Sequence, residues 1–108
     1  MRALILALLI AGGASPAFAA DLEANKKLYR SCLETIVNQR QPAAADRCFT
    51  ENFIEHNPNL PQGLAGRKQF AASLLAGFSD YHGEIQEMIA EGDRLVVRTL
   101  WTGTQDGP

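Results

Sequence analysis

Residues 81–104 carry two runs in which apolar and polar side chains alternate, separated by Gly92 and Asp93. Val, Ile, Leu, Thr and Trp are concentrated in the second run. Alternation with this composition predicts two β-strands. A two-residue loop that starts with glycine is typical of a type II′ turn, so we expect a β-hairpin in which Glu91 faces Arg94.

Counting outward from this turn assigns every side chain to one of two hairpin faces. The second face has a gap, because Gly103 is expected opposite His82. The imidazole of His82, the carboxylate of Glu84 and the indole of Trp101 would surround this gap, as a small-molecule pocket requires. A half-exposed sheet with one solvated face fits the pattern equally well. The first face pairs Ile85 with Leu100, Glu87 with Arg98 and Ile89 with Val96; the second places His82, Glu84, Gln86, Met88 and Ala90 opposite Gly103, Trp101, Thr99, Val97 and Leu95.

Two helices are predicted in the first half of the chain. Apolar residues recur at helical spacing within residues 22–40, and Asp21 is a suitable N-cap for this helix. Gln41-Pro42 ends it, because the residue before a proline is disfavoured in the helical conformation. A second, shorter helix is expected over residues 43–50.

A third helix is predicted over residues 66–77, after a segment rich in proline and glycine. Arg67 and Lys68 lie near its start, where cations are unfavourable unless an anion or carboxylate is close. We expect both side chains to be solvated. Helices followed by long antiparallel strands indicate an α+β roll.

Residues 1–20 have the pattern of a secretory signal peptide. Arg2 provides the positive start, residues 3–11 the apolar run, and residues 17–19 the small-x-small cleavage pattern. The apolar run is far shorter than the ~20 residues that span a bilayer. We therefore expect export to the periplasm or the medium, with residues 21–108 as a mature domain that is not membrane-bound.

Export affects how the two cysteines are interpreted, because thiols in an oxidising compartment are commonly bridged. Cys32 and Cys48 are equidistant from the expected turn near residue 40, where antiparallel helices would bring them together. We expect a disulfide between them. The alternative is two buried thiols that pack as small hydrophobic groups.

The composition predicts one small globular domain. The chain has 108 residues, of which 46% are hydrophobic and 20% charged, with a formal net charge of -2. It has no cluster of Lys and Arg with interleaved aromatics, so nucleic-acid binding is not expected. His56 and His82 lie far apart and outside any metal-ligand spacing, so no metal site is expected.

Three segments resemble one protein family. His56-Asn57-Pro58, GRKQFAASLLAGFSDYHGEI at 66–85 and MIAEGDRLVVRTLWTGTQDG at 88–107 are similar to the SnoaL-like polyketide cyclases, also called ester cyclases. That family belongs to the nuclear transport factor 2-like superfamily. The resemblance covers residues 25–108, and the combination of the three segments is fairly specific.

The resemblance implies a cone-shaped α+β roll, in which N-terminal helices pack on a curved antiparallel sheet around a deep, mostly apolar cavity. Cyclases of this family close rings of polyketide esters by an intramolecular aldol step, with acid and base groups and without a metal or organic cofactor. Together with the signal-peptide pattern, it indicates an exported cyclase, isomerase or hydrolase whose partner is a small hydrophobic molecule.

The resemblance also nominates site residues. His56 and His82 match pocket-side positions of the family, and Glu84 shares a predicted strand face with His82, so these three are the candidate catalytic groups. A base near the ester's α-carbon and a donor near the enolate are the minimum for the reaction. The candidate ligand-binding residues are Trp101, which also matches the family, and Gln86, Met88, Thr99 and Gln105.

Two departures from the family pattern weigh against catalysis. Gln105 occupies a position where the family commonly has histidine, and an amide cannot exchange a proton near neutral pH. The family continues through further strands that carry an essential acidic residue, so we expect the last strands to be missing after Pro108. A non-catalytic ligand-binding module of the same fold therefore stays open, as does a homodimer through the sheet.

Overall fold

The computed structural model describes residues 16–108, and most of the expected signal peptide, residues 1–15, lies outside the described residues. Within the described part, no helix is both long enough and apolar enough to cross a membrane. The elements in chain order are α1 (Pro16–Leu33), the π-helical turn η1 (Glu34–Asn38), the 3-10 helix η2 (Pro42–Arg47), α2 (Gly63–Gly77), β1 (His82–Glu91) and β2 (Arg94–Thr102).

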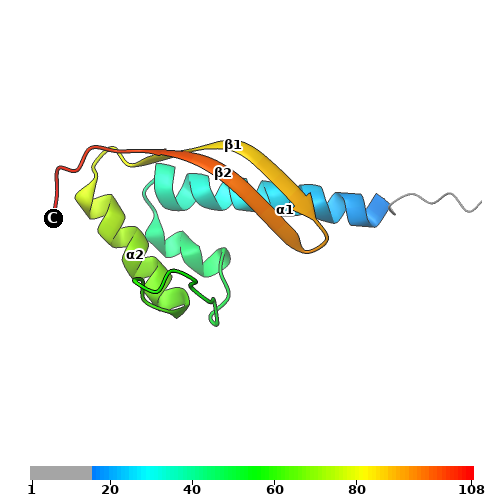
Figure 1. Ribbon diagram of the computed structural model, residues 1–108, viewed down its shortest axis with the longest axis horizontal. Coiled ribbons are helices and arrows are strands. Elements are labelled where there is room, and N and C mark those ends of the chain that lie inside the picture. The colour runs from blue at the N-terminus through cyan, green and yellow to red at the C-terminus, as the bar shows by residue number, and fades with distance from the viewer. Residues whose placement is uncertain (1–15) are drawn as a thin grey trace, which may run out of the picture.

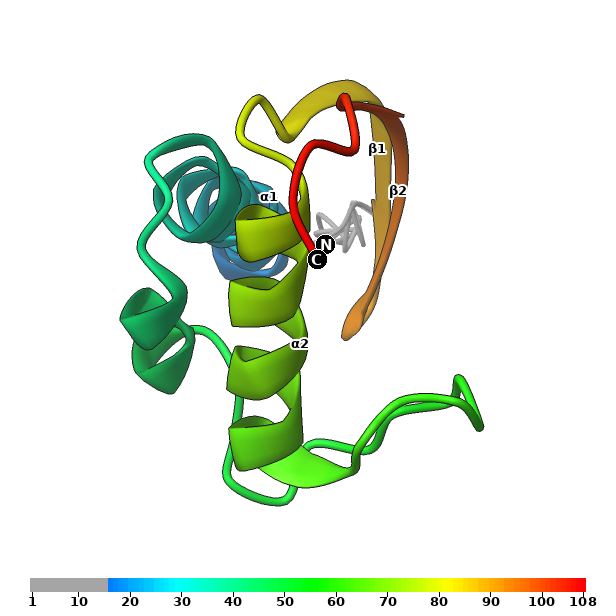
Figure 2. The ribbon, with the colours of Figure 1, turned by 90° about the vertical axis from the view of Figure 1, so that its left-hand side faces the viewer.

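The helices lie on one side of a two-stranded antiparallel sheet. Figure 1 shows the hairpin running along α1, with the axis of α2 inclined to both and lying near the end of the hairpin that is far from its turn. β1 packs against α1 and η1, while α2 packs against η1 and η2. Seen along α1, the hairpin is curved and arches beside the two helices (Figure 2). The fold is therefore α+β, as the sequence predicts.

Three helix boundaries differ from the prediction. α1 begins at Pro16, so Asp21 lies inside the helix and is not its N-cap. The second helix is a 3-10 helix that ends at Arg47, and α2 begins at Gly63, three residues earlier than expected.

The hairpin turn agrees with the prediction. Glu91 pairs with Arg94, and Ile89 pairs with Val96. Gly92 has a φ of 57°, whereas Asp93 is not among the residues with positive φ, which fits a type II′ turn.

A β-bulge at Gln86 makes the predicted register wrong beyond the middle of the hairpin. The bulge adds one unpaired residue to β1, and a one-residue slip moves every following side chain to the opposite face of the sheet. The expected gap at Gly103 opposite His82 therefore does not form. The observed pairs are His82 with Thr102, Gly83 with Trp101, Glu84 with Leu100 and Ile85 with Thr99.

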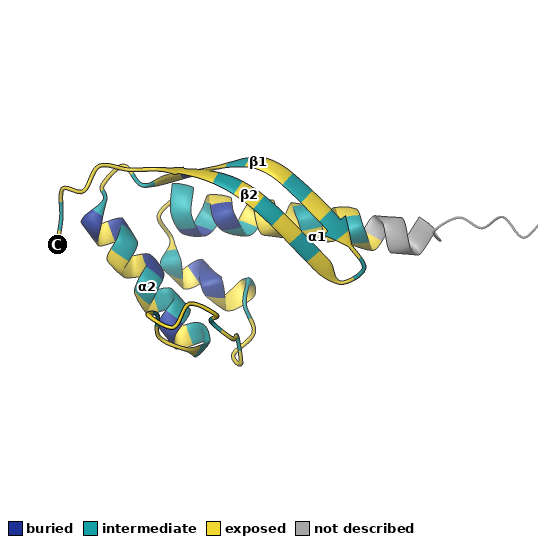
Figure 3. Ribbon diagram, viewed as in Figure 1, coloured by how far each residue is buried: buried dark blue, intermediate teal, exposed yellow. Residues whose placement is uncertain are grey.

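The buried core is small and lies where η1, η2 and α2 meet (Figure 3). It consists of apolar residues, and several partly buried side chains pack against it. The outer hairpin face leaves Ile89, Val96 and Leu100 exposed. The buried hydrophobic residues are Leu33, Ile36, Ala44, Ala45, Ala71 and Leu75.

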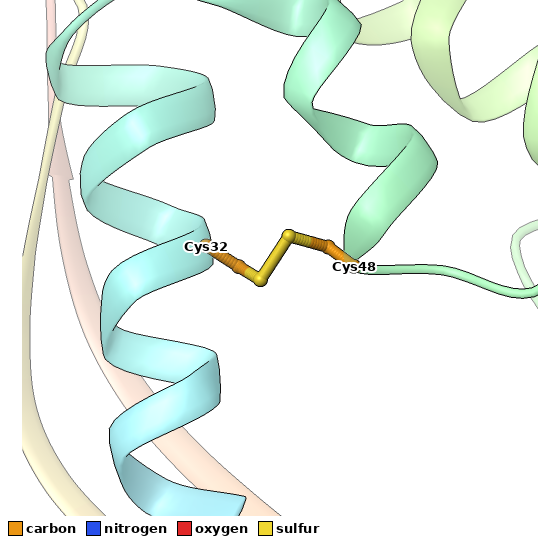
Figure 4. The surroundings of a disulfide bond; sticks show 2 residues. All are labelled: Cys32 and Cys48. Atoms are coloured by element: carbon orange, nitrogen blue, oxygen red, sulfur yellow. A yellow bond between two sulfur atoms is a disulfide. The ribbon is translucent and has the colours of Figure 1, made fainter.

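The expected disulfide between Cys32 and Cys48 is present at the edge of this core. The S–S distance is 2.07 Å and the Cα–Cα distance is 6.0 Å. Figure 4 shows the bridge joining α1 to the residue that follows η2. Both cysteines pack against the core cluster, so the bridge fixes the distance between the two helical segments.

Two polar side chains from the end of the first helical region attach it to later elements. The Asn38 side chain donates to the Gly83 carbonyl at 3.0 Å and accepts from the Gly83 N–H at 2.9 Å. The Arg40 guanidinium donates to the carbonyls of Leu75, Phe78 and Ser79 at the end of α2. A cation is favourable there because the last carbonyls of a helix lack intrahelical donors.

The last residues return to the end of α2. The Thr104 N–H and hydroxyl donate to Asp80, which lowers the pKa of that carboxyl. The Ser79 hydroxyl and N–H donate to Asp106 and lower its pKa in the same way. An isolated β-bridge joins Phe78 to Gln105. These contacts fix the start of β1 and the end of β2 relative to α2.

Removal of the disulfide tests how much the fold depends on it. The double variant Cys32→Ser/Cys48→Ser should lower the free energy of unfolding by about 3 kcal/mol, because the bridge closes a loop of about 15 residues. Urea denaturation with and without reductant measures the difference. Reductant should destabilise the native chain by a similar amount and leave the double variant unchanged. A native chain whose denaturation midpoint does not respond to reductant would contradict this expectation.

Candidate ligand-binding site

Two adjoining cavities lie between the helices and the inner face of β2. The larger has a volume of about 470 Å³ and the smaller about 300 Å³. Ile36, Val37, Arg67 and Trp101 line both, and we call the combined space the cleft. The larger cavity is also lined by Asn25, Leu28, Tyr29, Cys32, Leu33, Cys48, Phe49, Phe53, Glu55 and Leu95, and the smaller by Phe70, Ala71, Leu74, Leu75 and Tyr81.

One face of the first helical region forms a wall of the larger cavity. Its lining residues recur every three or four positions, which is the spacing of one helix face. Leu28 on this face is 54% exposed, and Tyr29 is also partly exposed. Nothing among the described residues covers this part of the helix completely, so apolar surface faces the cavity. The lining positions on this face are Asn25, Leu28, Tyr29, Cys32, Leu33 and Ile36.

Trp101 forms the opposite wall because of its place in the hairpin. It pairs with Gly83, and a Cβ atom at Gly83 would lie only 2.5 Å from Cζ3 of the Trp101 ring. The ring therefore lies over a position that only glycine can occupy without displacing it. Tyr81 stacks on Trp101 with a centroid distance of 5.4 Å and an interplanar angle of 6°.

Arg67 is held between two aromatic rings at the junction of the two cavities. Its Cζ atom lies 5.3 Å from the centroid of Phe49 and 5.7 Å from that of Phe70. Both distances are within the range of cation–π attraction. The side chain is half-buried, so the expectation that it is solvated is wrong.

Lys68, the other cation near the start of α2, is also not simply solvated. Its Nζ atom lies 2.8 Å from Oδ1 of Asp46 in η2. In contrast, no carboxylate of residues 16–108 forms an ion pair with Arg67. The charge on Lys68 is therefore compensated by an ion pair, whereas Arg67 faces two electron-rich rings and has no paired carboxylate among the described residues.

Tyr81 is the hydroxyl-bearing residue of the smaller cavity. Burial raises the pKa of its phenol, and the nearby positive charge of Arg67 partly offsets this by lowering the pKa. The ordinary phenol pKa is already near 10, so the hydroxyl is protonated at neutral pH and can donate a hydrogen bond.

The structure places the three candidate catalytic residues outside both cavities. His56 is exposed on the segment between η2 and α2, and His82 and Glu84 are exposed on β1. The bulge at Gln86 is the reason for the last two, because it turns them away from the face that carries Trp101. The three side chains are not brought together at the cleft.

Of the candidate ligand-binding residues, some lie on the hairpin face that borders the cleft and others do not. Trp101 lines both cavities, as expected of a pocket residue. Met88 and Thr99 are half-buried on the same hairpin face as Trp101, but they do not line either cavity, and the Met88 sulfur accepts a hydrogen bond from Arg30 at 3.3 Å. Gln86 is exposed at the bulge, and Gln105 is exposed beside Phe78.

The sequence pattern did not indicate that Arg67, Tyr81, Glu55 and the α1 face line the cleft. The spacing of the α1 residues was visible in the sequence, but it indicated only an apolar face and not what covers it. Arg67 and Phe70 are three positions apart in a predicted helix and could have been paired. The approach of Phe49 to Arg67 depends on the path of residues 48–62, which no periodicity predicts.

No group of three or more His, Cys, Asp or Glu side chains within residues 16–108 is arranged to hold a metal ion. The prediction that the protein uses no metal stays a prediction. The cleft offers a ligand a large apolar surface, a cation at Arg67, a carboxylate at Glu55 and a few uncharged polar groups.

Comparisons with known proteins support the resemblance found in the sequence. The family model for SnoaL-like polyketide cyclase matches residues 27–108. Among solved structures, TsrD from Streptomyces laurentii has a similar fold, with a TM-score of 0.72 and 23% sequence identity over 80% of this chain. The chain spans 63% of the length of that TsrD chain. A search of curated proteins gave no match.

The contact between Gly83 and Trp101 can be tested by adding one methyl group. Gly83→Ala should displace the Trp101 ring, shift its fluorescence emission and lower the free energy of unfolding by about 1–3 kcal/mol. Trp101 is the single tryptophan of the sequence, so the emission reports on this site alone.

Gly92→Ala is the matched control for this substitution. It is strained because Gly92 has positive φ, but a Cβ atom there has no neighbour within 4 Å. It should destabilise the chain without changing the emission spectrum. An unchanged Trp101 spectrum in Gly83→Ala would contradict the described packing.

Proposed function

Because the chain belongs to the SnoaL-like polyketide cyclase family, we propose that its cleft binds a small, largely apolar organic molecule. The observation that carries the proposal is an apolar cavity of about 470 Å³ between α1 and β2 that is lined by Trp101 and by the partly exposed face of α1. Ligand pockets commonly have this volume range and consist of apolar and aromatic walls with a few polar groups.

Catalysis by acid and base groups is the second candidate, and two side chains of the cleft favour it. Glu55 is the only carboxylate among the lining residues, and Tyr81 offers a protonated hydroxyl. A base and a proton donor are the minimum for cyclase or isomerase chemistry on an ester or polyketide-like substrate. We therefore add Glu55 to His56, His82 and Glu84 as a residue to substitute when turnover is assayed.

Saturable binding of a neutral aromatic probe tests the proposal. Titration of the full chain with 2-acetylnaphthalene should quench Trp101 fluorescence to a plateau. Leu28→Gln should weaken binding by about tenfold, because losing the apolar contact between the partly exposed leucine side chain and the probe costs roughly 1.4 kcal/mol. Ile89→Gln is the matched control, since Ile89 is 56% exposed but lies on the outer hairpin face.

The titration tests the cleft, and a turnover assay separates binding from catalysis. Saturable binding whose affinity falls in Leu28→Gln and is unchanged in Ile89→Gln supports the cleft as the binding site. Quenching that never saturates, or that both variants reduce equally, would contradict it. Polyketide esters recovered chemically unchanged after incubation favour a binding module, whereas their conversion, lost in Glu55→Gln, favours an enzyme.

We also propose that the protein is exported. The signal-peptide pattern of residues 1–20 supports this, and so does the Cys32–Cys48 disulfide, because such bridges persist in oxidising compartments. Mass spectrometry of the protein from a bacterial host should find a chain that begins near Ala20 or Asp21. Ala19→Arg should block this processing, and a native chain that keeps Met1 would contradict export by cleavage.

A further inference from the structure

Arg67 is the only charged side chain that lines the smaller cavity. The other lining residues there are aliphatic or aromatic, and Tyr81 supplies the hydroxyl group. A half-buried cation beside apolar walls loses part of its hydration, and this loss is unfavourable unless another group compensates it.

The protein compensates this charge incompletely. Phe49 and Phe70 offer their ring faces at 5.3 and 5.7 Å, which is worth less than a carboxylate in a hydrogen-bonded ion pair. No carboxylate in the described part of the chain pairs with Arg67, although the neighbouring Lys68 has Asp46. The N–H groups of the guanidinium are therefore available to a ligand.

Glu55 is the acidic side chain that could compete with a ligand for Arg67, because both residues line the larger cavity. Its Oε1 atom accepts a hydrogen bond from the backbone N–H of Asn57 at 3.0 Å. It does not line the smaller cavity. An anion on the Tyr81 side of Arg67 would consequently meet one cation and one hydroxyl donor, and no acidic lining residue.

The hydrogen-bond donors of Arg67 and Tyr81 determine which class of anion fits this part of the cleft. A guanidinium matches the two oxygens of a carboxylate in a planar, bidentate arrangement. A phosphate monoester carries about two charges at neutral pH, and a single arginine would leave the second charge poorly solvated among apolar walls. A carboxylate carries one charge and therefore balances Arg67.

We infer that the cleft takes an organic acid, with its carboxylate bound to Arg67 beside Tyr81 and its apolar body against Trp101. This inference rests on the proposed function, namely that the cleft binds a small molecule, and adds the chemical class of that molecule. Arg67 and Trp101 line both cavities, so a ligand anchored at Arg67 can extend its apolar part into the larger cavity.

The test compares three probes that share one ring system. Calorimetric titration of the full chain at pH 7 with 2-naphthoate should give a dissociation constant about tenfold or more lower than 2-acetylnaphthalene, its neutral analogue of similar shape. 2-Naphthyl phosphate should bind no more tightly than 2-naphthoate. Arg67→Met should abolish the preference for the acid, so that the dissociation constants of 2-naphthoate and 2-acetylnaphthalene agree within about threefold, because methionine keeps an apolar contact with the two rings but carries no charge.

Lys68→Met is the matched control, since it removes the same charge one position away and outside the cleft lining. It should keep the preference for 2-naphthoate, and Arg67→Lys should keep part of it. Far-UV circular dichroism and Trp101 emission establish that each variant is folded. The comparison of probes on the native chain needs no variant, so it remains decisive if Arg67→Met does not fold.

The outcomes distinguish this inference from the proposed function. If 2-naphthoate and 2-acetylnaphthalene bind the native chain equally well, the cleft binds small molecules but the assignment of an acid is wrong. Tighter binding of the phosphate also overturns it, as does a preference that survives in Arg67→Met or disappears equally in Lys68→Met. If neither the acid nor the neutral probe binds, the proposed function itself fails.

Discussion

The disulfide between Cys32 and Cys48 is the constraint on which the rest of the structure depends. The chain has a small core whose members are mainly alanine and leucine, so burial of apolar surface alone stabilises it weakly. The bridge fixes α1 beside the end of η2, and this places Phe49 next to α2. Both cysteines also line the larger cavity. The same covalent bond that stabilises the core therefore shapes a wall of the cleft.

The second determinant is the pairing of Gly83 with Trp101. Asn38 binds both backbone polar groups of Gly83, and this fixes β1 against the end of the first helical region. With no side chain at Gly83, the Trp101 ring can lie over the strand and stack on Tyr81. Arg67 completes the site from α2. Covalent, hydrogen-bonded and aromatic contacts from four distant parts of the sequence thus converge on one cleft.

Much of the fold follows from local patterns. The alternation around Gly92 and Asp93 determines the hairpin and its first pairs, and helical spacing determines the approximate extent of the helices. The candidate site was less predictable, because Trp101 alone among the nominated residues lines the cleft. The strand register predicted from the turn holds as far as the pair of Glu87 and Arg98. The unpaired Gln86 displaces every pair beyond it by one residue.

The sequence by itself determined the α+β class, the family, the hairpin turn and the pairing of the two cysteines, because each depends on residue type at short or fixed spacing. The tertiary structure alone decided which residues meet at the cleft. His82 and Glu84 face outward because a bulge, which has no sequence signature here, reverses their side of the sheet. Arg67 is a cleft residue because a ring from residue 49 reaches it across the fold. Contacts between distant segments depend on the path of the whole backbone, and local periodicity carries no information about that path.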